Sequence, residues 1–228
     1  MGDIVEHFGI KLQIDPHYMS EKMITVIREK RYEVEEARHI TKILQENEVV
    51  LEVGAGIGFV TTLIAKNPLT KRIVSYEANP LLIEHFRQTL TTNLTADQMD
   101  RLEIRNAVLK TGPAGGTVDF YIHNDFWASS LLPIPEPQKI EKVKVENFNA
   151  VVAELRPTMI VCDIEGGELA LFKNADLTGV KKVYIETHQK QLGRHGMKSL
   201  FEIFHARDFH YDQHHSERSV ILFSHVDR

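Results

Sequence analysis

The sequence predicts an α/β fold built on a doubly wound, mostly parallel seven-stranded sheet, with N-terminal helices before it and one antiparallel final strand. Two observations predict this class. The apolar run 49–53 ends in three glycines at alternate positions (Gly54, Gly56 and Gly58), and a helical apolar pattern resumes at Phe59. Further strand-and-helix steps of similar size follow it, which is typical of a parallel sheet covered on both faces.

The glycine-rich turn also predicts a ligand site. Glycine reaches positive φ without strain, and without a Cβ it lets a ligand lie directly on the backbone. The free N–H groups of the following helix then face a polar or anionic part of that ligand. The spacing G-x-G-x-G departs from the dinucleotide fingerprint G-x-G-x-x-G, whose third glycine would stand at Phe59. A turn that binds nothing is the alternative.

The other elements follow from apolar periodicity and capping residues. Residues 1–19 show no clear period, and we expect a loose arm or lid there. Ser20 is a plausible cap for the first helix. Further helices are expected at 33–46, 59–66, 80–94, 147–155, around 168–172 and at 197–206. Strands are expected at 49–53, 72–76, 102–108, 117–122, 140–145, 158–163, 182–185, 209–211 and 219–223.

Residues 111–140 interrupt the strand-and-helix rhythm with a glycine-rich turn and a proline-rich stretch. Long irregular insertions in compact domains usually carry function or are disordered. The lone tryptophan, Trp127, favours a loop that covers the substrate site, and Ser129 and Ser130 follow it. A tryptophan that only pins the loop to the core is the alternative.

Length and composition limit the number of domains, the partners and the location of the protein. The length of 228 residues and 43% hydrophobic content suit one domain, 1–228, with residues 1–46 as arm and helices. A net charge of -5 and a pI near 6.2 argue against a nucleic-acid partner. No apolar run approaches the ~20 residues that span a bilayer, so no membrane is expected. The single cysteine, Cys162, excludes an internal disulfide, and no secretory signal is visible, so we expect a cytoplasmic protein of unknown oligomeric state.

Residues at the carboxyl ends of the strands indicate the chemistry, because ligands of open α/β sheets bind there. Glu77 follows the second strand, 23 residues after Gly54, where an acid can hold a ribose diol; a helix-capping role is the alternative. No lysine or arginine ends these strands, which disfavours a phosphate-rich cofactor. Acids and apolar walls suit S-adenosylmethionine (SAM).

A family resemblance sharpens this interpretation. The glycine loop resembles the E/D-x-G-x-G-x-G signature of class I SAM-dependent methyltransferases. The run 163–168, Asp-Ile-Glu-Gly-Gly-Glu, resembles the D-[IV]-E-G-x-E motif of the FkbM family of SAM-dependent O-methyltransferases. The likeness covers about residues 30–210 and includes Tyr32-Glu33. Glu52 and Gly56 stand where many members carry Asp and Asn, without altering the backbone role.

The resemblance implies a set of site residues. The glycine loop would cradle the methionine part of SAM, Glu77 would hold the ribose, and the pair at 106–107 would flank the adenine. The expected cofactor residues are Glu52, Gly54, Ala55, Gly56, Gly58, Glu77, Ala78, Asn106, Ala107 and Asp163. The expected substrate residues are Trp127, Ser129, Ser130, Glu165 and Glu186.

Asp163 and His188 are the expected catalytic residues, since a carboxylate or an imidazole at a strand tip can remove the proton of an incoming hydroxyl. Asp163 could instead cap the helix that begins near Gly167, and His188 could be an ordinary hydrogen-bonded histidine. No metal is predicted, although the carboxylates of 163, 165, 168 and 186 with His188 could ligate a divalent ion.

These observations predict a SAM-dependent methyltransferase that methylates oxygen on a small molecule or sugar. Two alternatives stay open. One is an NAD-dependent oxidoreductase, disfavoured by Phe59, and the other is a SAM-binding scaffold without catalysis.

Overall fold

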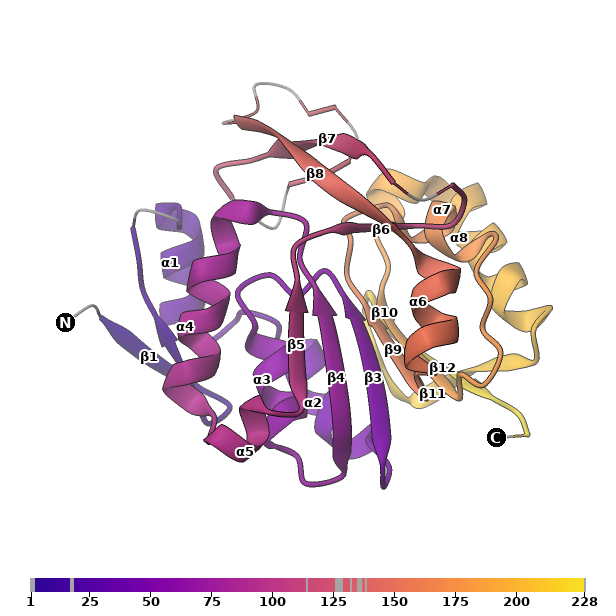
Figure 1. Ribbon diagram of the computed structural model, residues 1–228, viewed down its shortest axis with the longest axis horizontal. Helices are drawn as coiled ribbons and strands as arrows, with labels where there is room; N and C mark the ends of the chain where they lie inside the picture. The colour runs from indigo at the N-terminus through magenta and orange to yellow at the C-terminus, as the bar shows by residue number, and fades with distance from the viewer. Residues whose placement is uncertain are drawn as a thin grey trace.

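The computed structural model describes residues 3–16, 19–113, 115–125, 129–131, 133–134, 137 and 139–227. Its main sheet has seven strands in the order β11-β12-β10-β9-β3-β4-β5 (Figure 1). The bounds of these strands, in chain order, are β3 (Glu48–Val53), β4 (Thr70–Tyr76), β5 (Leu102–Arg105), β9 (Met159–Cys162), β10 (Lys182–Glu186), β11 (Phe209–Glu217) and β12 (Val220–His225).

The directions of these strands confirm the predicted fold class. β3, β4, β5, β9 and β10 pair in parallel, and β12 runs antiparallel to both of its neighbours, β10 and β11. The chain winds outward from β3 in one direction and from β9 in the other, so β3 and β9 flank the point where the strand order reverses. Ligands of such sheets bind beyond the strand ends at this point.

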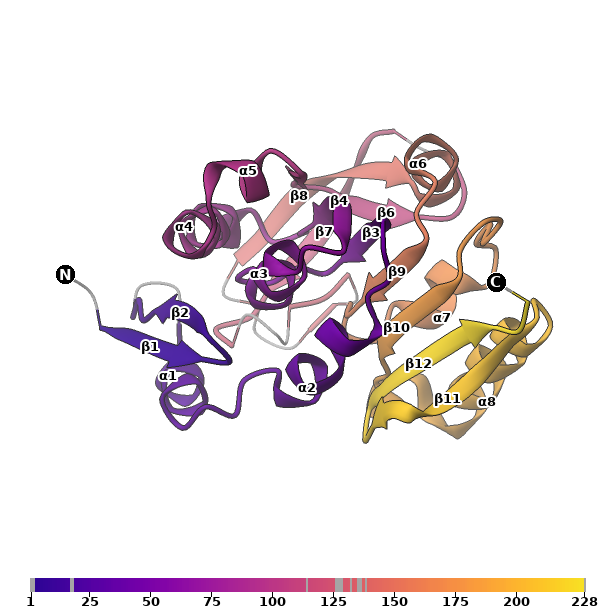
Figure 2. The same cartoon turned by 90° about the horizontal axis from the view of Figure 1, so that it is seen from below.

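Helices cover both faces of the sheet, and each face has its own core. Their bounds are α1 (Glu21–Arg28), α2 (Val34–Ile43), α3 (Phe59–Lys66), the 3₁₀ turn η1 (Pro80–Leu82), α4 (Ile83–Asn93), α5 (Ala96–Met99), α6 (Phe148–Leu155), α7 (Glu168–Phe172) and α8 (Gln189–His205). Buried residues of α1, α2 and α3 pack on one face, and those of α6, α7 and α8 pack on the other. Figure 2 shows α2 and α6 on opposite sides of the sheet.

Alternation along the strands explains how one sheet feeds two cores. In β3, Val50 belongs to the core beneath α1–α3, whereas Leu51 and Val53 belong to the core beneath α6–α8. Successive strand side chains point to opposite faces, so a strand covered on both sides is apolar throughout. This is why the run 49–53 is apolar except at Glu52, whose buried carboxylate accepts hydrogen bonds from Thr61 and Ser75.

The amino-terminal segment corrects one prediction. A loose arm is expected over residues 1–19, but β1 (Ile4–His7) and β2 (Ile10–Gln13) form an antiparallel hairpin. Phe8 and Gly9 both have positive φ in its two-residue turn, as a type I′ turn requires. Ile10 and Leu12 are buried where β2 meets α3 and α4. Strands of four residues are too short to show a clear period in the sequence.

The insertion forms a second, small sheet over the carboxyl ends of the main strands. β6 (Val108–Lys110) pairs in parallel with β8 (Lys139–Asn147), and β7 (Thr117–Ile122) pairs with β8 in antiparallel fashion. In Figure 1 the arrowheads of β3, β4 and β5 point toward this sheet. The expected single strand 102–108 is therefore two strands, β5 and β6, in different sheets. Trp127 lies outside the described residues.

The capping predictions can be checked directly. The Ser20 side chain accepts a hydrogen bond from the Met23 N–H at the start of α1, which confirms its expected role. Gly167 precedes α7 without a side-chain cap, so Asp163 does not cap that helix. Within the described part of the chain, no helix combines the length and the apolar character needed to cross a membrane.

Candidate active site

A cavity of about 380 Å³ opens at the carboxyl ends of β3, β4, β9 and β10. One end is bordered by the glycine loop and by Glu77. The small sheet covers the cavity with Val108 and Phe120. The far end of the cavity is lined by acids from α2 and from the tips of β9 and β10. The cavity therefore joins a predicted cofactor half to an acidic half.

The glycine loop needs its glycines for packing as well as for ligand access. Gly54, Gly56 and Gly58 all have positive φ. A Cβ on Gly54 would lie 1.6 Å from the backbone oxygen of Asp163, and one on Gly58 would lie 2.2 Å from the Phe86 ring. Gly54 and Gly56 line the cavity, whereas Gly58 lies outside its wall.

Two backbone hydrogen bonds fix the position of the Glu77 carboxylate. Its two carboxylate oxygens accept hydrogen bonds from the backbone N–H groups of Gly56, at 2.7 Å, and Asn79, at 2.6 Å. Burial raises the pKa of this carboxyl to about 7, against the opposing effect of these N–H groups. Each oxygen keeps a second lone pair. Glu77 borders the cavity, so it can still accept hydrogen bonds from a diol.

Of the other expected cofactor residues, some line the cavity and one holds the lining residues in place. Ala78 and Ala107 line the cavity. Asn106 does not line the cavity but stabilises the lining backbone, because its side-chain amide donates hydrogen bonds to the backbone oxygens of Glu77 at 2.8 Å and of Ala78 at 3.1 Å.

Glu52 and Ala55 lie outside the main cavity and border a small adjoining one. Glu52 is buried, and it accepts hydrogen bonds from the hydroxyl groups of Thr61 and Ser75. Burial raises the pKa of Glu52 to about 7. The structure therefore gives Glu52 a supporting position beneath the glycine loop, without access to the main cavity.

The acidic end of the cavity is built from three segments. Its carboxylates include Glu33 and Glu36 from the start of α2, Asp163 and Glu165 from the loop after β9, and Glu186 from the tip of β10. Burial, followed by the charges of Glu186 and Glu165, raises the pKa of Asp163 well above its usual value. The pKa of Glu165 rises to about 7, mainly through burial. The carboxyl groups at this end of the cavity outnumber the positive charges around them. The acidic end therefore favours the binding of a cation or of hydrogen-bond donors.

The acids on α2 show the same effect. Burial, with the charge of Glu36, raises the pKa of Glu33 well above its usual value. Burial, with the charge of Glu186, raises the pKa of Glu36 to about 8.

His188 lies behind these carboxylates rather than in the cavity wall. Its Nδ1 is 2.6 Å from Oε1 of Glu168, and its Nε2 is 3.3 Å from Oε2 of Glu165 and 3.6 Å from Oδ1 of Asp163. Burial lowers its pKa, but the hydrogen bond to Glu168 and the surrounding acids outweigh this and raise it to about 8. A histidine protonated at neutral pH is a poor general base. Among the acids around it, Glu165, with a pKa of about 7, lies nearest to the value that suits this role.

The expected substrate residues are only partly brought together. Ser129, Glu165 and Glu186 line the cavity. Ser130 pairs with the backbone of Tyr121 through two hydrogen bonds and lies outside the wall. Trp127 is not among the described residues.

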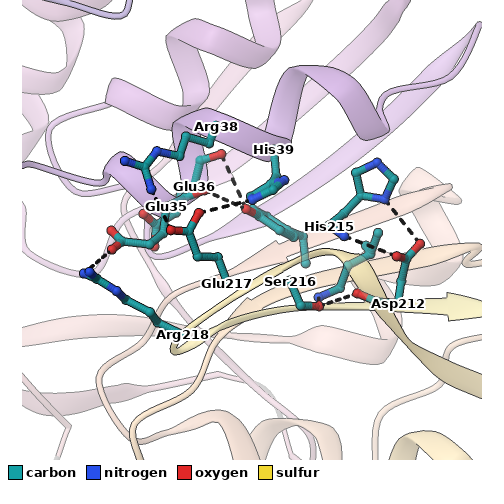
Figure 3. A network of polar contacts seen from close by, with 11 residues as sticks. Glu35, Glu36, Arg38, His39, Asp212, His215, Ser216, Glu217 and Arg218 are labelled. Atoms are coloured by element: carbon teal, nitrogen blue, oxygen red, sulfur yellow. Dashed lines mark hydrogen bonds and ion pairs between the residues drawn. The ribbon is translucent and has the colours of Figure 1, made fainter.

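A polar network fixes the acidic end (Figure 3). Glu217 of β11 pairs with Arg38, at 2.6 Å, and with His39 of α2, at 3.3 Å. Arg218, in the turn between β11 and β12, pairs with Glu35 of α2 at 2.6 Å. Because α2 and this turn both border the cavity, the network holds its two walls together.

The site residues expected from the sequence do not include Glu33 or Glu36, and Glu168 appears there only as a possible metal ligand. The pair Tyr32-Glu33 is part of the family resemblance, and this is the available signal for Glu33. Its backbone has a φ of 44°, in the left-handed region, immediately before α2. Glu168 belongs to the 163–168 motif, but its contact with His188 depends on the packing of α7 against α8.

Comparisons with known proteins agree with this architecture. Residues 4–113 match the model of the TRM5/TYW2 methyltransferase domain. The probable ribosomal RNA small subunit methyltransferase A of Methanosphaera stadtmanae is 26% identical over 109 residues, 45% of this chain and 35% of that protein. The chain thus spans about a third of this curated relative.

Two similar solved structures share the fold. Methyltransferase FkbM from Methylobacillus flagellatus has a TM-score of 0.52 at 14% identity, over 92% of this chain and 56% of that one. Trm5b from Pyrococcus abyssi has a TM-score of 0.50 at 13% identity, over 97% and 55%.

The fold and the family model that matches residues 4–113 define the class of this domain: the chain carries a class I SAM-dependent methyltransferase domain, whose cofactor is SAM. The family whose model matches, over just under half of the chain, is TRM5/TYW2. The predicted class is confirmed, but the matching model is not that of the FkbM family.

One prediction is contradicted. The sequence interpretation favours a small-molecule acceptor and no nucleic-acid partner, whereas the matching model is that of the TRM5/TYW2 domain and the curated relative is a probable ribosomal RNA methyltransferase. The reasoning fails because net charge describes the whole chain. A nucleic-acid surface needs cations only where the phosphates lie.

Proposed function

We propose that this chain transfers the methyl group of SAM to a nucleotide of a structured RNA, of the tRNA kind. The match of residues 4–113 to the TRM5/TYW2 domain carries the proposal. This segment contains the glycine loop and Glu77, and it also contains the acids on α2. It thus covers the cofactor half of the cavity and part of the acidic half.

The acidic half suits a nucleobase better than a phosphate. Carboxylates such as Glu36 and Glu186 accept hydrogen bonds from the N–H groups on a base edge, whereas they repel phosphate. Enzymes that act on a base commonly take it out of its stack into a pocket and read its edge there. The base would therefore enter the cavity while the phosphates stay outside.

Exposed cations lie on the segments that border the cavity. They are Lys30 and Arg31 between α1 and α2, and Arg218 between β11 and β12. Arg31 itself lines the cavity mouth. Cations at these places would hold the backbone of an RNA whose base is inserted, because phosphate contacts position a nucleic acid and base contacts specify it.

The chemistry requires orientation and one proton acceptor. When bound, SAM would supply the methyl group, and its sulfur would keep the electron pair of the broken bond to the methyl carbon. The glycine loop and Glu77 orient the cofactor, which supplies much of the rate. Glu165, a carboxylate of the loop after β9 that lines the cavity, takes any proton that the acceptor atom loses.

A transfer assay tests the proposal. The purified chain is incubated with SAM labelled in its methyl group and, in separate reactions, with total tRNA and total ribosomal RNA. We expect label in tRNA, and nuclease digestion with mass spectrometry then identifies the methylated nucleoside. A protein that binds SAM but labels neither RNA would refute this function and leave the scaffold alternative.

The phosphate contacts are tested with matched arginine variants. Arg31→Ala should raise KM for RNA severalfold and reduce the salt dependence of binding by about one phosphate contact. Arg72→Ala is the control, because this exposed arginine lies in β4 outside the cavity wall. Equal effects of the two substitutions would remove Arg31 from the RNA interface.

A further inference from the structure

Three side chains at the tips of neighbouring strands have the arrangement of metal ligands. Asp163 follows β9, Glu186 ends β10, and His188 comes two residues later. One oxygen of each carboxylate and one imidazole nitrogen all lie within 4.8 Å of one another. Since β9 and β10 pair in parallel, their carboxyl ends meet at this point.

A buried carboxylate orients the histidine. Glu168 is fully buried, and its Oε1 is 2.6 Å from Nδ1 of His188 and accepts a hydrogen bond from the Gly166 N–H. This contact turns Nε2 of the ring toward the other carboxylates. Histidines that bind metals almost always present their second ring nitrogen to such a carboxylate or carbonyl, which fixes the ring and increases its basicity.

Two buried oxygen atoms in this cluster lack a partner. Among the described residues, Oδ1 of Asp163 and Oε2 of Glu168 are inaccessible to solvent and accept no hydrogen bond. Oδ1 of Asp163 is 3.6 Å from Nε2 of His188, beyond hydrogen-bond distance. A cation between these two atoms would satisfy the Asp163 oxygen.

We propose that Asp163, Glu186 and His188 bind a divalent cation of the Mn²⁺ type. Carboxylates suit Mn²⁺, Mg²⁺ and Ca²⁺, whereas an imidazole ligand favours a transition metal, and among these three ions Mn²⁺ alone is a transition metal. Bonds of about 2.1 Å put adjacent ligand atoms about 3 Å apart and opposite ones about 4 Å apart. The observed spread needs only a small inward movement of the side chains.

Three protein ligands leave coordination positions open toward the cavity, because Asp163 and Glu186 line it. A ligand oxygen of the methyl acceptor could occupy one of them. The cation site does not depend on the identity of that acceptor.

Direct Mn²⁺ binding tests the site. The chain is titrated with Mn²⁺ in the absence of SAM and RNA, and free Mn²⁺ is measured by electron paramagnetic resonance. We expect one saturable site per chain. Glu186→Gln and His188→Ala should each weaken it at least tenfold, and Glu168→Gln, which releases the ring of His188, by about 10–100-fold.

Glu84→Gln is the control, since Glu84 is an exposed acid in the first turn of α4 and lies outside the cavity wall. Its affinity for Mn²⁺ should equal that of the unmodified chain, and circular dichroism establishes that every variant is folded. The proposal is overturned if the unmodified chain shows no saturable site, or if Glu84→Gln weakens binding as much as Glu186→Gln does.

Saturating SAM provides a second readout. Retention of Mn²⁺ supports a site beside the cofactor. Complete displacement would mean that these carboxylates hold the ammonium group of SAM, and it would overturn the proposal.

Discussion

Replacing Glu77 by glutamine should weaken SAM binding at least tenfold. In the structure each carboxylate oxygen accepts one backbone N–H, from Gly56 or from Asn79. Glutamine has one oxygen and one NH₂ group, so one of these N–H groups would face a donor. An unmet buried N–H costs about 1–3 kcal/mol, and each charge-assisted bond to the ribose contributes about 1.5–3 kcal/mol. Since about 1.4 kcal/mol is a factor of ten, losing one ribose bond already gives the expected effect.

Calorimetric titration with SAM and with its 2′-deoxy analogue separates the two roles of Glu77. The 2′-deoxy analogue lacks one of the two ribose hydroxyls, so neither the unmodified chain nor the Glu77→Gln variant can bind that group. If Glu77 contacts the ribose, the substitution should therefore weaken binding of the analogue much less than binding of SAM. Glu84→Gln, an exposed acid in the first turn of α4, is the control and should bind both ligands normally. The same loss for SAM and for the analogue would show that Glu77 only supports the loops.

Two further predictions concern stability. Gly54→Ala should prevent folding or lower the melting temperature by many degrees, because its Cβ would lie 1.6 Å from the Asp163 oxygen; Gly179→Ala, with a similar φ of +84° but open space, should cost only about 1 kcal/mol. Equal losses in thermal unfolding would contradict the packing argument. For Glu52, burial raises the pKa to about 7, so the folded state holds the proton more tightly than the unfolded state. The contribution of this group to the free energy of unfolding is fully present below pH ~4.3 and is lost as the pH rises through about 7. Glu52→Gln should therefore reduce the fall in unfolding free energy between pH 5 and pH 8 by roughly 2–3 kcal/mol. An unchanged pH profile in denaturant titrations would refute it.

Much of the main sheet can be predicted from the sequence because its signals are local. A buried strand, a glycine turn and a helix follow one another within 49–66, and α3 begins and ends where its apolar pattern does. The β1–β2 hairpin cannot be predicted in this way. Its strands have four residues each, and Ile10 and Leu12 are recognisable as core only once α3 and α4 pack against them.

Part of the site follows from the same local reasoning. Strand tips in a parallel sheet share one edge, so the sequence alone predicts that Glu77, Asp163 and Glu186 lie around one ligand site. In the structure all three side chains line one cavity. The proposed roles of these residues in binding and catalysis still depend on the experiments described above.

The sequence by itself determined the fold class, the glycine-rich loop and the acids at the strand tips, because period, glycine spacing and strand ends are properties of neighbouring residues. Only the tertiary structure decided that Glu33 and Glu36 complete the acidic end and that Glu168 orients His188. It also decided that Glu52 lies beneath the loop. These contacts join segments from different parts of the chain, and they form only when helices and strands close on one another.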